Sequence, residues 1–262
     1  MDLMDAQDKP CLVMLHGWGY DHQCWPEQLI DQLSQMFTLV LLDLPGHGPS
    51  PSQYLDIDTW IQEQHQQLPS RYCLLGWSLG GQVAIRWASL VNGGDHAQPK
   101  VQQLVLLATN PKFSTGDDWP NAMEGEVLTQ FCHAFTDQPA KTLRRFASLQ
   151  AQGSNEVKAL ITQMMTLMDV QPNKQYGLVL LQQLDERKHL LDLSIPYTIE
   201  LAKDDALVPF KWLQSQGAGA NVNAALCHTR YIMGGHAYPL QDLGLAQRVI
   251  DFLTQNNPPK QQ

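Results

Sequence analysis

Several classes of protein are excluded by what the 262-residue sequence lacks. It has no apolar run near the roughly 18 residues that a membrane-spanning helix needs. Its five cysteines are irregularly spaced and include no C-x-x-C pair, which argues against a disulfide framework or a zinc site. The N-terminal residues lack the basic and apolar regions of a signal peptide. We therefore expect a cytoplasmic protein that has no contact with a membrane.

Basic residues are also scarce. The chain has 17 Lys and Arg against 26 Asp and Glu, and its net charge of -9 argues against nonspecific nucleic-acid binding. We find no set of metal ligands and no glycine loop that would hold a phosphate, so we expect no metal and no cofactor. The hydrophobic content of 44% is that of a globular protein, which we expect to be a monomer.

Short apolar runs alternate with helical patterns in the first part of the chain. Strands are expected at Cys11–His16, Thr38–Asp43, Arg71–Leu75 and Val101–Ala108. Helices are expected at Pro26–Gln35, Ile57–Leu68 and Gln82–Leu90. Strands that are apolar almost throughout and alternate with helices indicate a mostly parallel sheet covered by helices on both faces, which is an α/β fold.

Helical periodicity replaces this pattern between residues 111 and 189. Helices are expected at Met123–Ala134, Ala140–Gln150, Val157–Met168 and Gln175–Leu184. Strands then resume at Tyr197–Ala202 and Cys227–Met233, and a helix at Pro239–Asn256 closes the chain. The pattern predicts an α/β core made of residues 1–110 and 190–262, with an inserted all-helical lid subdomain at residues 111–189.

The stretch Gly76-Trp77-Ser78-Leu79-Gly80 matches the G-x-S-x-G pattern of a nucleophile elbow. An apolar strand precedes it and a helix-compatible run follows it, as that motif requires. Ser78 would sit in a strained turn with positive φ, where its hydroxyl is exposed above the sheet edge. Glycine-rich turns are usually only turns, but this setting favours a catalytic serine.

A serine nucleophile needs a general base, and that base needs a carboxylate to orient it. In this fold the chain order should be serine, acid, histidine, with the last two in loops after late strands. Asp205 and His236 occupy such positions, so we predict the triad Ser78, Asp205 and His236. Asp204 competes with Asp205, and either residue could instead cap the helix that follows.

An oxyanion hole needs two backbone N–H donors. The N–H of Leu79, directly after the nucleophile, should be one of them. The other should come from the loop after the first strand, His16-Gly17-Trp18-Gly19, where we choose the N–H of Trp18. The alternative for this loop is an ordinary tight turn.

The assembled pattern resembles the α/β-hydrolase superfamily over essentially the whole chain. Within it, four stretches resemble the methyl ester esterases that act on pimeloyl-acyl-carrier protein in biotin synthesis: L-H-G-W-G (15–19), D-L-P-G-H-G-P-S (43–50), G-W-S-L-G-G (76–81) and R-F-A-S-L-Q (145–150). The resemblance implies the same triad. It also implies substrate contacts from Trp18, Ser78, Leu79, Phe146, Ala147, Ser148, Leu149, Gln150 and His236. The chain before Cys11 is short, so the first antiparallel hairpin of the full fold could be partly missing.

The resemblance implies an acyl carrier protein as partner, and such proteins are acidic. The distribution of charge along this chain therefore indicates where the partner could dock. Residues 112–189 have a net charge of -1, whereas the rest of the chain has -8. On the helix expected at 140–150, Lys141, Arg144 and Arg145 fall on one face, and Lys158 could extend it. Leu143, Phe146 and Ala147 make an adjoining apolar face. We hypothesise that the basic face docks the carrier protein, although such a face is usually only solvated.

The function that we predict is hydrolysis of the methyl ester of pimeloyl-acyl-carrier protein by a serine carboxylesterase. Two other enzymes on the same scaffold remain open, a broad short-chain carboxylesterase acting on small esters and the menaquinone-pathway lyase that uses a similar triad. The lyase should have a cationic pocket, and Gln82, not arginine, follows Gly81 at the elbow. A catalytically silent binding protein of the same fold is the non-enzyme alternative.

Overall fold

A parallel six-stranded sheet forms the centre of the molecule. In this computed structural model the described residues are 9–51, 56–93, 100–168, 174–214 and 222–255. The strands are β1 (Cys11–Leu15), β2 (Thr38–Leu42), β3 (Tyr72–Trp77), β4 (Val101–Leu107), β5 (Tyr197–Ala202) and β6 (Cys227–Ile232). Their spatial order is β2-β1-β3-β4-β5-β6, and every neighbouring pair is parallel. The predicted α/β class is therefore confirmed.

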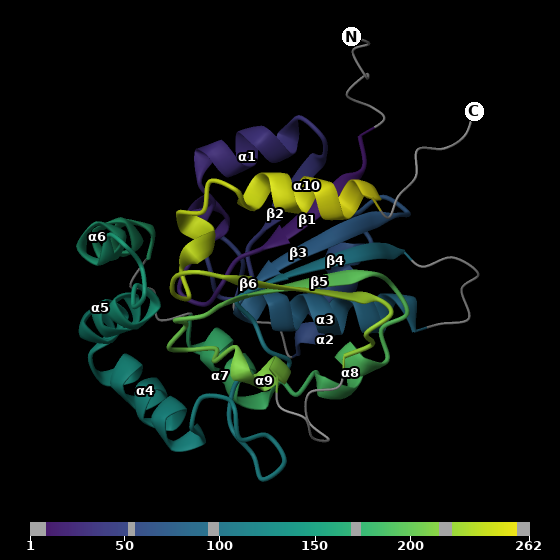
Figure 1. The fold of residues 1–262 in the computed structure, drawn as a ribbon. Coiled ribbons are helices and arrows are strands. Elements are labelled where there is room, and N and C mark those ends of the chain that lie inside the picture. The colour runs from purple at the N-terminus through teal and green to yellow at the C-terminus, as the bar shows by residue number, and fades with distance from the viewer. Residues whose placement is uncertain (1–8, 52–55, 94–99, 169–173, 215–221, 256–262) are drawn as a thin grey trace, which may run out of the picture.

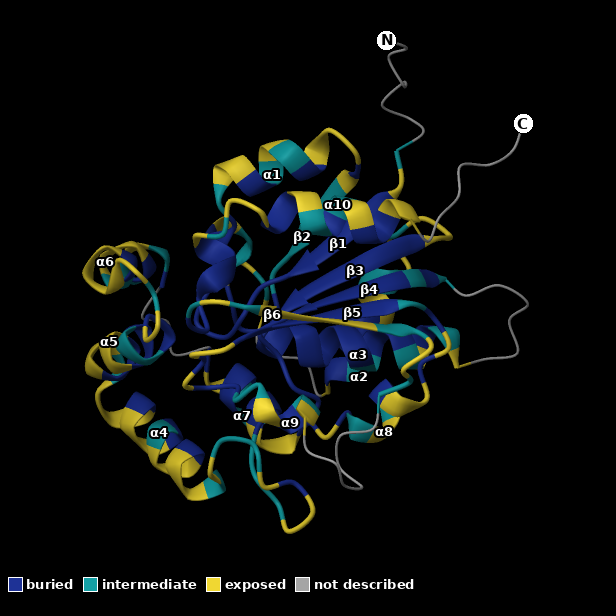
Figure 2. Ribbon diagram, in the orientation of Figure 1, coloured by how far each residue is buried: buried dark blue, intermediate teal, exposed yellow. Residues whose placement is uncertain are grey.

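Helices cover both faces of this sheet, as the apolar strands require. On one face lie α1 (Glu27–Ser34) and α10 (Leu245–Gln255), and on the other lie α2 (Ile57–His65) and α3 (Leu79–Asn92) (Figure 1). Figure 2 shows the strands β1, β3, β4 and β5 as mostly buried, while exposed residues gather on the outer faces of the helices. The core therefore lies between the sheet and its two helical layers.

Between β4 and β5 the chain is helical in the described residues. It forms α4 (Gly125–Asp137), α5 (Pro139–Gln150), α6 (Val157–Leu167), α7 (Gln175–Gln183) and α8 (Arg187–Leu191). In Figure 1, α4, α5 and α6 stand together away from the sheet, whereas α7 and α8 lie beside α3. The lid boundary at residues 111–189 remains a prediction, because the last two helices of that segment pack against the core helix α3.

Several element boundaries differ from those expected. Helix α3 begins at Leu79, directly after the serine, and not at Gln82. The expected helix at 239–256 begins only at Leu245 and follows a short 3-10 turn at Tyr238–Leu240; its expected last residue lies outside the described residues. The two edge strands are less buried than the four central ones: β2 is partly exposed, and Thr229 to Tyr231 of β6 are exposed.

Among the described residues no strand precedes β1, so a first hairpin is not seen there, and residues 1–8 lie outside the description. No helix in the described ranges is both long and apolar enough to cross a bilayer.

Candidate active site

The serine loop joins β3 to α3 at the carboxyl edge of the sheet. Ser78 has φ +54° and ψ -118°, which is the strained conformation expected of a nucleophile elbow. A Cβ added to Gly76 would lie 2.3 Å from the carbonyl oxygen of Gly80. Only glycine therefore permits strand and helix to approach so closely. The Ser78 carbonyl is held by the Thr109 hydroxyl, which donates to it at 2.8 Å.

Three side chains from loops after β3, β5 and β6 meet at this edge. His236 Nε2 lies 2.9 Å from Ser78 Oγ, and His236 Nδ1 lies 2.7 Å from Asp205 Oδ2. Because a carboxylate can only accept, Nδ1 carries the proton and Nε2 is left to accept from the serine hydroxyl. Asp205, Ser78 and His236 are at most 8% exposed. The geometry is that of a base oriented by an acid beside a nucleophile.

The acid loop fixes one carboxylate oxygen of Asp205 with backbone donors. Asp205 Oδ1 accepts the N–H groups of Leu207 and Val208, both at 2.8 Å. Its other oxygen faces the imidazole. Asp204, the competing candidate, is exposed, and the structure therefore brings Asp205 and not Asp204 to the histidine.

The predicted oxyanion donors flank the serine. The loop carrying Trp18 packs against it, since a Cβ on Gly17 would lie 3.4 Å from Ser78 Cβ. Leu79 is the first residue of α3, where backbone N–H groups have no partner inside the helix. Within the described residues, the backbone N–H groups of Trp18 and Leu79 are not engaged in any hydrogen bond. Both can thus donate to a ligand oxygen.

Two buried histidines brace the Trp18 loop. His16 Nε2 accepts the N–H of Leu44 at 3.0 Å, and its Nδ1 donates to the Gly17 carbonyl at 2.8 Å. His47 Nε2 accepts the N–H of Gly19 at 3.3 Å. Burial lowers the pKa of His16 to about 4 and also lowers the pKa of His47. Both imidazoles are therefore neutral at pH 7, as these acceptor roles require.

The end of α5 holds the histidine loop in place. The Gln150 carbonyl accepts the N–H of Ala237 at 3.2 Å, and the His236 carbonyl accepts Trp77 Nε1–H at 3.2 Å. Gln150 Oε1 accepts the Tyr20 hydroxyl at 3.2 Å, while its buried Nε2 has no partner among the described residues. The predicted contact residue Gln150 thus lies within reach of the loop that carries the base.

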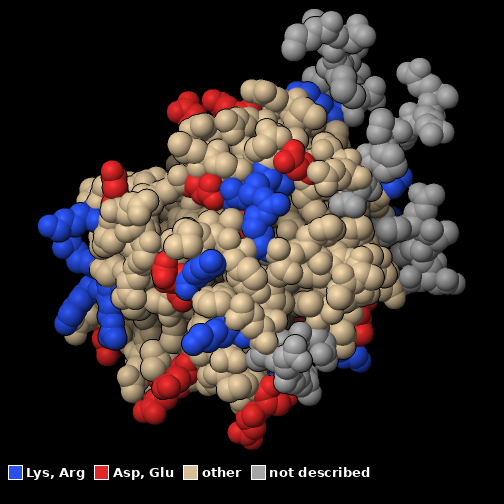
Figure 3. Space-filling view, in the orientation of Figure 1, with Lys and Arg blue, Asp and Glu red and all other residues tan. Residues whose placement is uncertain are grey.

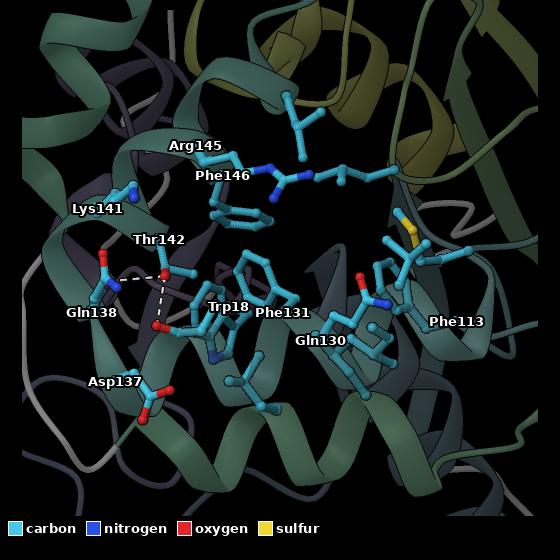
Figure 4. A pocket seen from close by; sticks show the side chains of 18 residues that line it. Trp18, Phe113, Gln130, Phe131, Asp137, Gln138, Lys141, Thr142, Arg145 and Phe146 are labelled. Carbon is cyan, nitrogen blue, oxygen red and sulfur yellow. Dashed lines mark hydrogen bonds between the residues drawn. The ribbon is translucent and has the colours of Figure 1, made fainter.

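A cavity of about 450 Å³ opens between α4, α5 and α7. Its wall is largely aromatic and aliphatic: Trp18 packs edge-on against Phe131 and Phe146, with ring centroids 5.3 and 5.0 Å away. In Figure 4, Asp137, Gln138 and Lys141 lie on one side of the cavity and Phe113 on the opposite side. Leu207, two residues after Asp205, completes the wall. The cavity therefore reaches both the acid loop and the Trp18 loop.

The structure separates the predicted contact residues into three groups. Trp18, Phe146 and Leu149 line the cavity. Ala147 is fully buried behind it, and the Ser148 hydroxyl donates to the Arg144 carbonyl. Ser78, Leu79 and His236 lie beside the cavity and are not among its lining residues. That these residues bind substrate remains a prediction.

Basic side chains gather on the outer surface of α5 and α6. Lys141, Arg144, Arg145 and Lys158 are all exposed. Figure 3 shows basic groups at the edge of the molecule where α5 and α6 lie in Figure 1. Lys141 and Arg145 also border the cavity, whereas Arg144 and Lys158 do not. The expected basic face therefore exists and adjoins the cavity.

One group of potential metal ligands occurs in the described part of the chain, namely Asp21, His22 and Asp43. Their polar atoms already form hydrogen bonds with one another and with backbone N–H groups. The Asp43 carboxylate accepts the N–H and Nδ1–H of His22, and Asp21 caps the short turn that follows it. Hydrogen bonding explains this arrangement, so we assign it no metal.

Sequence reasoning missed several residues around the site. Phe131 and Phe135 are spaced four residues apart on α4, but the expected helix ended at Ala134 and so left Phe135 out of that apolar face. Tyr20, Lys174 and Gly177 carry no local signal, because their contacts come from distant parts of the chain.

A family model described as alpha/beta hydrolase family matches residues 12–248. Among curated proteins, the pimeloyl-[acyl-carrier protein] methyl ester esterase of Nitrosomonas europaea is 39% identical over 214 residues, which are 78% of this chain and 82% of that protein. The esterase of the same name from Xylella fastidiosa (strain M23) is 34% identical over 87% of this chain and 88% of its own.

Two further matches are informative. The biotin biosynthesis bifunctional protein BioHC of Cellvibrio japonicus is 34% identical over 93% of this chain, but the match spans only 47% of that longer protein. The solved esterase EaEST of Exiguobacterium antarcticum superposes with a TM-score of 0.76 over 93% of this chain and 91% of its own, at 19% identity. At that identity the likeness concerns the fold alone.

Proposed function

Because this chain belongs to the alpha/beta hydrolase family, we propose that it hydrolyses an ester through Ser78, His236 and Asp205. Family membership and its esterase relatives identify it as an ester hydrolase. The observation that carries the residue assignment is the continuous chain of hydrogen bonds from Ser78 Oγ to Asp205 Oδ2. A histidine that accepts from a serine and donates to a buried carboxylate is the arrangement that activates a serine nucleophile.

In the proposed reaction, Ser78 Oγ attacks the ester carbonyl carbon while His236 Nε2 takes the hydroxyl proton. The carbonyl oxygen becomes an anion held by the N–H groups of Trp18 and Leu79. His236 then gives its proton to the departing methoxide, which leaves as methanol while the acyl group stays bound to Ser78 Oγ. Water, deprotonated by His236, attacks the acyl-serine and releases the acid and free Ser78. Asp205 stabilises the imidazolium at each step.

We propose as substrate the methyl ester at the far end of a pimeloyl chain attached to acyl carrier protein. The names of the relatives support this choice. A cavity of about 450 Å³ with an apolar wall fits the general range of about 300–1,000 Å³ for small-ligand sites. The exposed Lys141 and Arg145 at its border would face an acidic carrier protein, and Arg144 and Lys158 would extend that docking face.

We also propose that the enzyme acts as a monomer in the cytoplasm and needs no metal or cofactor. All five cysteines are free thiols, which suits a reducing compartment. Sedimentation of the purified chain tests the first point. A mass near twice 29.5 kDa would contradict it.

The Ser78→Ala variant tests the chemistry. We expect loss of turnover on both free and carrier-bound esters with an unchanged melting temperature, because the hydroxyl makes no contribution to packing beyond its bond to His236. Labelling of the wild-type serine by a fluorophosphonate provides the positive control. Retention of most activity in the alanine variant would remove the mechanism.

The double variant Lys141→Glu/Arg144→Glu tests the docking face. We expect kcat/KM on the carrier-bound ester to fall roughly 10-fold or more, with little change on free dimethyl pimelate, because rim charges act mainly on encounter. Lys188→Glu, an exposed lysine on α8, is the matched control. An equal effect of the double variant on both esters would contradict the docking role.

A further inference from the structure

A buried lysine at the start of α7 touches two consecutive residues of the Trp18 loop. Lys174 is only 2% exposed, and its Nζ donates to the Gly19 carbonyl at 2.7 Å. The backbone carbonyl of the same lysine accepts Trp18 Nε1–H at 2.9 Å. Lys174, which lies between β4 and β5, thus makes two hydrogen bonds to the loop that contains the proposed oxyanion donor, the N–H of Trp18.

Gly19 is held from its other side as well. Its N–H donates to His47 Nε2, so the amide and the carbonyl of this residue are both fixed by side chains. Gly19 has φ +92°, a conformation that L side chains rarely adopt. The ammonium of Lys174 also contributes to lowering the pKa of His47, which helps to keep the imidazole a neutral acceptor. The two contacts therefore support each other.

The first turn of α7 packs against the side chains of Trp18 and Leu79, the two residues whose backbone N–H groups are the proposed donors. A Cβ added to Gly177 would lie 2.7 Å from Trp18 Cδ1, 2.8 Å from His47 Cε1 and 3.3 Å from Leu79 Cδ2. The missing side chain lets the helix rest directly against these groups. Helix α7 contacts both the core helix α3 and helix α4 (Figure 1). Lys174 is thereby placed at the back of the loop rather than in the cavity, which it does not line.

We propose that Lys174 is a positioning residue for the oxyanion hole, acting through the Trp18–Gly19 backbone. The proposal rests on the proposed function. Burying an ammonium costs several kcal/mol, and a single hydrogen bond typically returns less than that, so we assign Lys174 a role beyond stability. The ammonium contributes instead a strong bond to Gly19 that fixes the direction of the neighbouring Trp18 N–H. A displacement of about 1 Å at such a donor can cost about 100-fold in rate.

The test compares Lys174→Met with Lys188→Met, which removes an exposed lysine from α8. Free methyl or p-nitrophenyl esters are used, so that carrier docking plays no part. We expect Lys174→Met to lower kcat roughly 10- to 100-fold, with KM changed less than about twofold. The inhibition constant of a trifluoromethyl ketone, whose adduct with the serine carries an oxyanion, should rise by the same factor as kcat/KM falls. The melting temperature should fall by only a few degrees, because methionine leaves the Gly19 carbonyl without its donor.

A second variant separates the ammonium from packing. Lys174→Ala should recover activity with added propylammonium, which restores the lost atoms and charge, and not with 1-propanol of similar size. If Lys174→Met fails to fold, the comparison of propylammonium with propanol carries the test.

Unchanged kcat and inhibitor affinity in Lys174→Met would overturn the proposal. So would a fall in kcat accompanied by a parallel loss of thermal stability and equal recovery with propanol, which would make Lys174 a packing residue only. If wild type and Lys188→Met themselves fail to turn over the free esters or to be labelled at Ser78, the proposed function fails instead. The two failures are therefore distinguishable.

Discussion

Replacing Asp205 with asparagine should disable the enzyme without unfolding it, and the contacts show why. Asp205 Oδ1 accepts two backbone N–H groups, from Leu207 and Val208. In the Asp205→Asn variant only the amide oxygen can accept them, so the NH₂ group must face His236 Nδ1. The NH₂ group is a donor, and Nδ1 must then give up its proton to accept from it.

The neutral imidazole would then carry its proton on Nε2, which points at Ser78 Oγ. A protonated Nε2 cannot take the hydroxyl proton, so the base is present but in the wrong tautomer. The same change in a serine protease lowers kcat about 10⁴-fold. We expect a similar loss here, which corresponds to about 5.5 kcal/mol of transition-state stabilisation.

The assay is kcat on a free ester, with thermal unfolding measured in parallel. Asp204→Asn is the matched control, because Asp204 is the neighbouring, exposed carboxylate and should stay within about twofold of wild type. If Asp205→Asn keeps more than about a tenth of the activity, or if Asp204→Asn shows the larger loss, the assignment of the acid is wrong.

Two other predictions concern stability. Gly76→Ala should lower the free energy of unfolding by about 3 kcal/mol or more, because its Cβ would lie 2.3 Å from the Gly80 carbonyl oxygen. Gly125→Ala is the control, since a Cβ there meets nothing within 4 Å. Equal melting temperatures for the two variants would contradict the close approach at the elbow. For His16, the folded pKa of about 4 lies below the unfolded value of 6.5, so the unfolded state binds more protons between them. The free energy of unfolding should therefore fall, by about 3 kcal/mol from this group, as the pH drops from 6.5 to 4. His16→Gln should lack this part of the pH dependence in denaturant titrations, and an unchanged slope would refute it.

The sequence predicted the elements whose signals are local. The apolar runs that became β1, β3, β4 and β5 are strands because parallel strands buried on both faces need continuous apolar side chains. The nucleophile elbow was predictable because the close approach of strand and helix requires glycine at positions 76 and 80, and these glycines form a recognisable motif. Asp205 and His236 were found from their places after late strands, and the structure brings them together with Ser78.

Contacts between distant segments were not predictable in this way. Nothing near Lys174 in the sequence indicates that its ammonium is buried against Gly19, 155 residues earlier. Likewise, the helical periodicity of residues 175–184 predicts a helix but not that α7 packs against both α3 and α4. The expected strand at 227–233 is present as β6, and its exposure follows from its position at the edge of the sheet.

The central claim is that this esterase recognises a carrier-bound methyl ester. The measurement that tests it most directly is kcat/KM for methyl pimeloyl-acyl-carrier protein beside free dimethyl pimelate, at low and at high salt. We predict a strong preference for the carrier-bound ester that salt erodes, because exposed Lys141, Arg144 and Arg145 would attract the acidic carrier. Equal rates on the two esters at both salt concentrations would contradict the claim and leave a general esterase.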